Sequence, residues 1–91
     1  MQEGRLQEGA AVDSLATLLP GQSATIDSLT GDVGLIRRLK ALGLSRGQRI
    51  YLLRRAWLAG PLHVRVGMTE LMLRRVDATR IRISSPIGET A

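Results

Sequence analysis

The chain has 91 residues and no cysteine, which allows one small domain and excludes a disulfide framework, a thiolate metal site and a cysteine nucleophile. Aliphatic side chains must fill the core, because 44% of the residues are hydrophobic but only one Trp, one Tyr and no Phe occur. The 13 basic and 8 acidic residues give a net charge of +5, which favours an acidic protein surface, nucleic acid or anionic lipid as partner.

Both ends of the chain have the composition of tails. Residues 1–12 are rich in Gln, Glu, Gly and Ala without an apolar period, so we expect a disordered leader. Residues 85–91 are expected to form a polar tail, which leaves residues 13–84 as the folded unit. No signal-peptide pattern and no apolar run of membrane-spanning length occur, so we expect a cytoplasmic protein without membrane insertion.

The folded unit is expected to open with a helical turn over 14–19 and a strand over 22–29. A Pro-Gly pair ends the turn. After it, Ala24 and Ile26 alternate with polar residues, which predicts a strand that buries one face.

An amphipathic helix is predicted over 32–42. Asp32 is a good N-cap, because its carboxylate accepts from free backbone N–H groups of the first turn. Gly43 stands where a helix ends by entering the left-handed region, and Leu44 would then pack back on the helix. Apolar residues recur at helical spacing at Leu35, Ile36, Leu39 and Leu42.

A hairpin with a two-residue turn is predicted at Gly67 and Met68. This turn pairs Val64 with Leu71, which places both in the core and turns His63 outward. The remaining elements are a strand over 49–55, the hairpin strands over 62–66 and 69–73, a helical turn over 75–79 and a strand over 80–83. The expected fold is therefore mainly β with a short inserted helix, an SH3-like small five-stranded barrel.

The predicted core follows from these faces. It consists of Ile26, Ile36, Leu39, Leu44, Ile50, Leu52, Val64, Val66, Leu71, Leu73, Ile81 and Ile83.

Four segments together resemble the FeoA family. The matching motifs are Leu15-x-x-Leu18-x-x-Gly21, Arg38-Leu39-x-x-Leu42-Gly43-Leu44-x-x-Gly47, Gly60-Pro61-Leu62-His63-Val64-Arg65-Val66-Gly67 and Leu73-Arg74-(x3)-Ala78-x-x-Ile81-x-Ile83. Leu42 and Ala59 stand where family members often carry Met and Gly. The resemblance implies an SH3-like accessory protein of ferrous iron uptake, which binds the cytosolic G-protein region of the FeoB transporter or the transporter's cytosolic membrane-facing elements.

We expect no enzyme, because no set of nucleophile, base and orienting residue can be assembled. The alternative function is a basic small-barrel regulatory or nucleic-acid-binding module, related to the C-terminal domain of iron-dependent repressors. Two aromatic residues are too few for a base-stacking platform, so we expect no nucleic-acid binding.

One candidate metal site lies on the outer face of the predicted hairpin. His63 and Glu70 would be neighbours there, with Met72 opposite His63. No cofactor is required by this pattern, but the pair would bind a divalent cation weakly if a second subunit of a homodimer completed the site. The alternative is an exposed histidine on an outward strand face.

A candidate partner-binding surface surrounds the connection between the strands over 49–55 and 62–66. It comprises Trp57, Leu58, Tyr51 and Leu53, together with Leu62. These residues form either an exposed apolar patch with Trp57 as its main contact, or a cluster that the N-terminal turn covers.

Basic residues add a second candidate partner contact, centred on Arg37 and Arg38 of the predicted helix. For the set, docking of an acidic partner competes with a solvated basic face. The two groups of cations are Arg37, Arg38, Lys40, Arg46 and Arg49, and Arg54, Arg55, Arg74 and Arg75.

Overall fold

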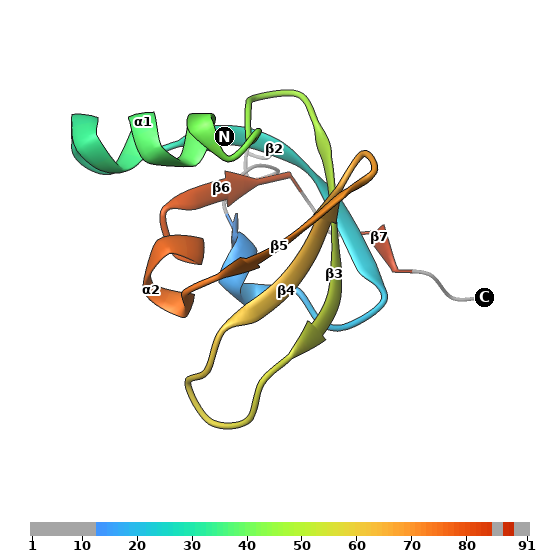
Figure 1. The fold of residues 1–91 in the computed structure, drawn as a ribbon. Helices are drawn as coiled ribbons and strands as arrows, with labels where there is room; N and C mark the ends of the chain where they lie inside the picture. Colours follow the sequence, from blue (N-terminus) through green and yellow to red (C-terminus); the bar gives the residue numbers. More distant parts are fainter. Residues whose placement is uncertain (1–12, 85–86, 89–91) are drawn as a thin grey trace, which may run out of the picture.

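The computed structural model describes residues 13–84 and 87–88, so the predicted leader over 1–12 lies outside the described residues. Figure 1 shows a strongly curled sheet with α1 across one end and a long loop at the other. The elements are β1 (Asp13–Ser14), the 3₁₀ turn η2 (Leu15–Thr17), β2 (Gln22–Leu29), α1 (Val33–Ala41), β3 (Arg49–Arg55), β4 (Leu62–Val66), β5 (Thr69–Leu73), α2 (Arg75–Ala78), β6 (Ile81–Ile83) and β7 (Ile87–Gly88).

The strands form one antiparallel sheet in the order β1-β6-β2-β3-β4-β5, and β7 also pairs with β2. The long strand β2 is central, because β3 lies along one edge while β6 and then β7 follow the other. β7 lies in the segment expected to be a polar tail. The five longer strands are those predicted, but β1 and β5 are edge strands, so the described sheet curls around the core without closing.

The hairpin of β4 and β5 has the predicted register, with Val64 opposite Leu71 and His63 opposite Met72. Gly67 has a φ of +61°, as a primed two-residue turn requires. The β3–β4 pairing contains an irregularity between Leu52 and Arg54 that periodicity did not predict. Beyond it, the alternation of faces along β3 changes, since the register shifts by one residue.

Both ends of α1 are capped as predicted. Asp32 Oδ1 accepts from the backbone N–H of Leu35 at 2.8 Å. Gly43 has a φ of +101°, and its N–H donates to Lys40 O at 2.9 Å while Leu44 N–H donates to Leu39 O at 3.2 Å. This pair of bonds is a Schellman motif, which explains why glycine follows the helix.

The core is aliphatic, as composition required, and ten of the twelve predicted residues are buried in it. Leu71 is partly buried against the core. The prediction for Ile36 is wrong, because Leu35 and Leu39, one turn apart, are the α1 residues that meet the core. The buried hydrophobic residues are Leu15, Leu18, Ala24, Ile26, Leu39, Leu44, Ile50, Leu52, Leu62, Val64, Val66, Leu73, Ala78, Ile81 and Ile83.

The N-terminal turn contributes more to the core than the sequence indicated. Leu15 and Leu18 are fully buried, and η2 contacts α2 and β6. Arg55 fastens this segment to the end of β3, since its Nη1 donates to the carbonyl oxygens of Ala16 at 2.9 Å and Leu18 at 2.7 Å. The turn therefore seals one end of the sheet.

Candidate partner-binding surface

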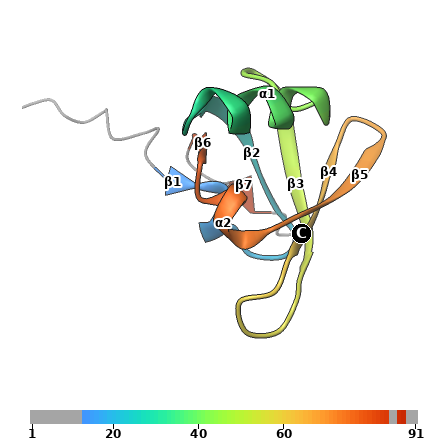
Figure 2. The ribbon, with the colours of Figure 1, turned by 60° about the vertical axis from the view of Figure 1, so that its left-hand side comes forward.

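The loop between β3 and β4 extends away from the sheet (Figure 2). It carries two exposed apolar side chains. Trp57 is 90% exposed and Leu58 is 91% exposed. The loop is nevertheless closed by backbone hydrogen bonds, from Ala56 N–H to Pro61 O at 3.0 Å and from Gly60 N–H to Trp57 O at 3.1 Å. We call this segment, residues 56–61, the apolar loop.

The conformation of Leu58 is strained. Its φ is +58°, in a region that costs a non-glycine residue roughly 1–2 kcal/mol. A hydrogen bond from Arg75 Nη2 in α2 to Leu58 O, at 3.2 Å, holds the backbone there. The loop thus presents the Leu58 side chain outward in an arrangement that the rest of the fold stabilises.

A cavity of about 550 Å³ lies beside the apolar loop. Ala59 and Pro61 form its loop side, and Val76 and Thr79 of the α2 region lie opposite. Val76 is itself exposed. Under the loop, the Nε atom of Arg75 is buried and has no hydrogen-bond partner among the described residues. An exposed apolar tip beside a mostly apolar hollow has the character of a protein-binding surface.

The other members of the predicted apolar cluster lie elsewhere. Leu62 is fully buried, so its assignment to a partner surface is wrong; it faces the core opposite Leu73. Tyr51 and Leu53 are half-buried on β3, and Arg65 stacks on the Tyr51 ring at 4.6 Å from its centroid. The N-terminal turn leaves Trp57 exposed, since Leu15 and Leu18 face the core and Leu19 is itself exposed.

Arg37 and Arg38 lie on α1, at the opposite end of the molecule from the apolar loop (Figure 1). Both are exposed. Arg38 Nη2 lies 3.9 Å from Asp77 Oδ1, while Arg37 lines a shallow hollow of about 270 Å³ with Lys40. The structure therefore separates the basic helix face from the apolar tip.

His63 and Glu70 meet as the hairpin register predicted. His63 Nε2 and Glu70 Oε1 are 2.9 Å apart, and Met72 is exposed beside them. In the part of the chain that the structure describes, no group of three or more His, Cys, Asp or Glu side chains gathers in a way that would hold a metal. Among the described residues, His63 and Glu70 are two adjacent ligands for a cation on this face.

The sequence did not reveal that two of the arginines form hydrogen bonds with the protein's own backbone. Arg55 and Arg75 appeared as members of a charge cluster, yet Arg55 donates to two carbonyl oxygens and Arg75 to one, each in a distant segment. No local pattern marks such a contact, because the carbonyl groups come from residues remote in sequence.

None of the described helices is long and apolar enough to span a membrane.

A family model for the FeoA domain matches residues 14–85. No curated protein matches the chain. Among solved structures, it is similar to FeoA from Chlorobium tepidum, with 34% identity, a TM-score of 0.71 and coverage of 78% of this chain and 68% of that one. It is also similar to FeoA from Stenotrophomonas maltophilia complexed with zinc, with 26% identity, a TM-score of 0.73 and coverage of 85% and 98%.

A manganese-dependent transcriptional repressor shares the fold, with 23% identity and a TM-score of 0.73. This chain spans 40% of that protein, and 79% of this chain is covered. The Stenotrophomonas protein is described as a procaryotic SH3 domain protein, so the predicted SH3-like fold is confirmed. FeoA proteins are associated with ferrous iron transport. By the match over residues 14–85 and the likeness to solved FeoA structures, this chain belongs to the FeoA family.

Proposed function

We propose that this protein is a cytoplasmic accessory factor of ferrous iron uptake that binds the cytosolic G-protein region of a FeoB-type transporter. It acts by binding and not by catalysis. The observation that carries the proposal is the apolar loop, whose two large apolar side chains are exposed while the Leu58 backbone is held in a strained conformation. Exposed tryptophan beside an apolar hollow is typical of the centre of a protein interface.

The basic face of α1 supports the same proposal in a different way. Arg37 and Arg38 are exposed and add to a net charge of +5. Because these charges lie at the opposite end of the molecule from the apolar loop, they contribute to the rate of encounter with an acidic partner more than to the lifetime of the complex. Trp57, Leu58, Arg37 and Arg38 are therefore proposed as partner-binding residues, with Tyr51 and Leu53 on the flank of β3.

Isothermal titration of the chain against the G-protein region of the transporter, with GDP and with a GTP analogue, tests the proposal. We expect saturable binding that Trp57→Ala weakens. Met68→Ala is the matched control, because Met68 is 99% exposed at the other end of the hairpins. Absence of binding in both nucleotide states, repeated with the full transporter in detergent, would contradict the proposal.

Metal is proposed to play a secondary part. His63 and Glu70 supply two neighbouring ligands, and a second copy of the chain would be needed to complete a coordination shell. The zinc complex of the Stenotrophomonas protein makes zinc the first ion to test. The likeness to the manganese-dependent repressor shows a shared fold and supports no repressor activity, since the identity is 23%.

A further inference from the structure

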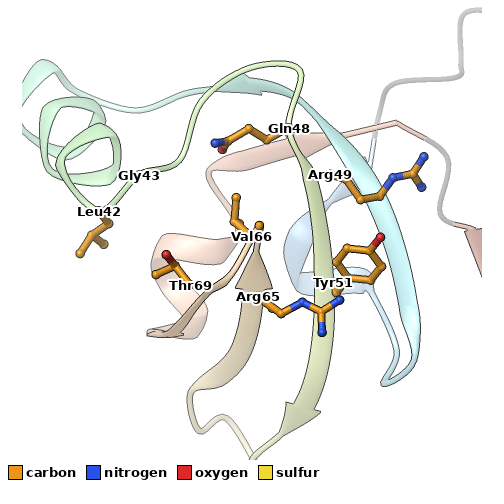
Figure 3. A pocket seen from close by; sticks show the side chains of 9 residues that line it. Leu42, Gly43, Gln48, Arg49, Tyr51, Arg65, Val66 and Thr69 are labelled. Atoms are coloured by element: carbon orange, nitrogen blue, oxygen red, sulfur yellow. The ribbon is translucent and has the colours of Figure 1, made fainter.

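A second cavity lies at the start of β3, at the far end of that strand from the apolar loop. Its volume is about 510 Å³, and it extends from the end of α1 to the turn between β4 and β5. Figure 3 shows Arg49, Tyr51 and Arg65 on one side of it and Leu42 and Thr69 on the other. The lining thus combines guanidinium groups with apolar surface.

The sheet register places the two arginines on one face of the sheet, on either side of Tyr51. Tyr51 pairs directly with Arg65 across β3 and β4, and Arg49 lies two residues before Tyr51 on the same face. Arg49 and Arg65 are therefore diagonal neighbours, about 7–8 Å apart at their backbones. The Tyr51 ring lies between their side chains in Figure 3, with the Arg65 guanidinium 4.6 Å from its centroid.

Neither guanidinium contacts a carboxylate in the described part of the chain. Arg49 Nη1 donates to the neutral Ser23 Oγ at 3.2 Å, and Arg65 stacks on Tyr51. Glu70, which is opposite Arg65 in the sheet, contacts His63 instead. Arg38 and Arg74 differ from this pair, because both have Asp77 as a partner.

We propose that this cavity binds a carboxylate side chain of an acidic protein segment, with Arg49 and Arg65 as the residues that hold it. A guanidinium matches a carboxylate by two parallel N–H···O bonds, which gives such a contact both strength and orientation. The Leu42 side chain is 43% exposed at the rim, so an apolar residue beside the acidic one would be covered as well.

The same lining favours a peptide over a nucleic acid or a free phosphate. A nucleobase needs an open aromatic face, but Arg65 already stacks on Tyr51. Inorganic phosphate would use the guanidinium groups and leave the apolar rim exposed. The inference goes beyond the contact proposed for the apolar loop, and either site can fail experimentally while the other holds.

An NMR titration of the isotopically labelled full chain with a short synthetic peptide tests the proposal. The probe is acetyl-Leu-Glu-Glu-Leu-amide, and its control replaces both Glu by Gln. We expect saturable shifts of the Arg49 and Arg65 Nε–Hε signals and of the Leu42 methyl groups. The Gln peptide is expected to bind about tenfold more weakly, because charge-assisted hydrogen bonds are lost.

Single substitutions locate the site. Arg49→Gln and Arg65→Gln are each expected to weaken the Glu peptide about fivefold or more. Arg46→Gln is the matched control, since it removes the same charge from an exposed arginine that does not line the cavity. It is expected to change the affinity less than about twofold, as a screened surface charge. Arg65→Lys keeps the charge and loses the planar guanidinium, so its affinity for the Glu peptide should lie between those of the unaltered chain and Arg65→Gln.

Three results would overturn the proposal. Equal binding of the Glu and Gln peptides would show that no carboxylate is recognised, and this comparison needs no variant. An equal effect of Arg46→Gln would show general attraction by net charge. Displacement of the peptide by inorganic phosphate at the peptide's own concentration range would assign the cavity to phosphate.

Discussion

The two ends of the β3–β4 pair differ in how they present a surface. At the loop end, Trp57 and Leu58 are exposed apolar side chains, and the backbone of Leu58 is strained. At the other end, Arg49 and Arg65 flank a half-buried tyrosine beside the capped end of α1. An apolar tip contributes affinity because binding removes its surface from water. Paired guanidinium groups instead contribute orientation and selectivity for an anion. One strand pair therefore carries two surfaces with different physical roles.

The largest effect is expected at the loop end. Trp57→Ala should weaken partner binding by about 2 kcal/mol or more, as tryptophans at interface centres do. The free energy of unfolding should change by less than about 0.5 kcal/mol, because the side chain is 90% exposed. Titration and urea melts measure the two quantities. Loss of folded protein in Trp57→Ala would place the residue in the core and remove the contrast between the ends.

Two glycines, one near each end of the β3–β4 pair, are expected to lower stability for different reasons when they are replaced. Gly43→Val should cost roughly 1–3 kcal/mol of stability through backbone strain alone, since φ is +101° and an added Cβ meets nothing within 4 Å. Gly60→Ala should cost a similar amount by crowding, because its Cβ would lie 2.6 Å from Ala56 Cβ.

Rescue distinguishes the two causes. Ala56→Gly should restore part of the loss in Gly60→Ala, because it removes the Cβ at 2.6 Å and leaves the tight contact with Trp57 O at 3.1 Å. No neighbouring substitution should restore Gly43→Val. Urea melts of the single and double variants measure this, and an unchanged midpoint for Gly43→Val would show that α1 tolerates another ending.

Reversing the charge of the α1 face should act on the rate of binding. Arg37→Glu combined with Arg38→Glu should slow association with the transporter about tenfold at low salt, and less as salt rises. The dissociation rate should change little. Stopped-flow measurements at several ionic strengths test this, with the Gln pair as an intermediate control. A change confined to dissociation would place these arginines inside the interface.

The strain at Leu58 predicts an opposed effect on stability and binding. Leu58→Asn should raise the free energy of unfolding by about 0.5 kcal/mol, because Asn adopts positive φ more readily. It should also weaken partner binding by removing an exposed apolar side chain. Leu19→Asn is the control, since Leu19 is exposed without positive φ and should show no gain. A loss of stability at Leu58 would refute the strain.

The smallest effect is expected from metal. Zinc should bind the monomeric chain no tighter than roughly micromolar, because His63 and Glu70 are two ligands where a stable site needs three or four. His63→Ala should remove this binding and Met72→Leu should not. Calorimetry on a sample shown to be monomeric measures it, and stoichiometric nanomolar uptake would contradict the prediction.

The sequence predicted the parts of the fold that depend on local chemistry. The cap at Asp32, the helix end at Gly43 and the hairpin register follow from side-chain type and turn length alone. Leu62 was assigned to the surface because of its neighbours in the connection, although the alternation of β4 places it on the buried face with Val64 and Val66. Ile36 was misplaced because helical spacing allowed a wider apolar stripe than the one that meets the core, which consists of Leu35 and Leu39.

The candidate sites were predictable to different degrees. Trp57 stood out as the one tryptophan, in a connection between strands. The cavity of Arg49 and Arg65 was not predicted, because those residues are sixteen positions apart and become diagonal neighbours only through strand pairing. Arg75 under the apolar loop was equally hidden, since its acceptor is a backbone carbonyl.

The central position of β2 sets the order in which the chain can acquire its structure. The end of β2 is joined to the start of β6 by two hydrogen bonds, in which the backbone N–H and the hydroxyl of Thr30 donate to the carbonyl oxygen of Arg80, fifty residues later. Pairings between segments so distant in sequence slow folding, because the intervening chain must be confined first. During synthesis, one edge of β2 therefore stays unpaired until β6 has left the ribosome. The sheet can therefore be completed only late in the synthesis of the chain.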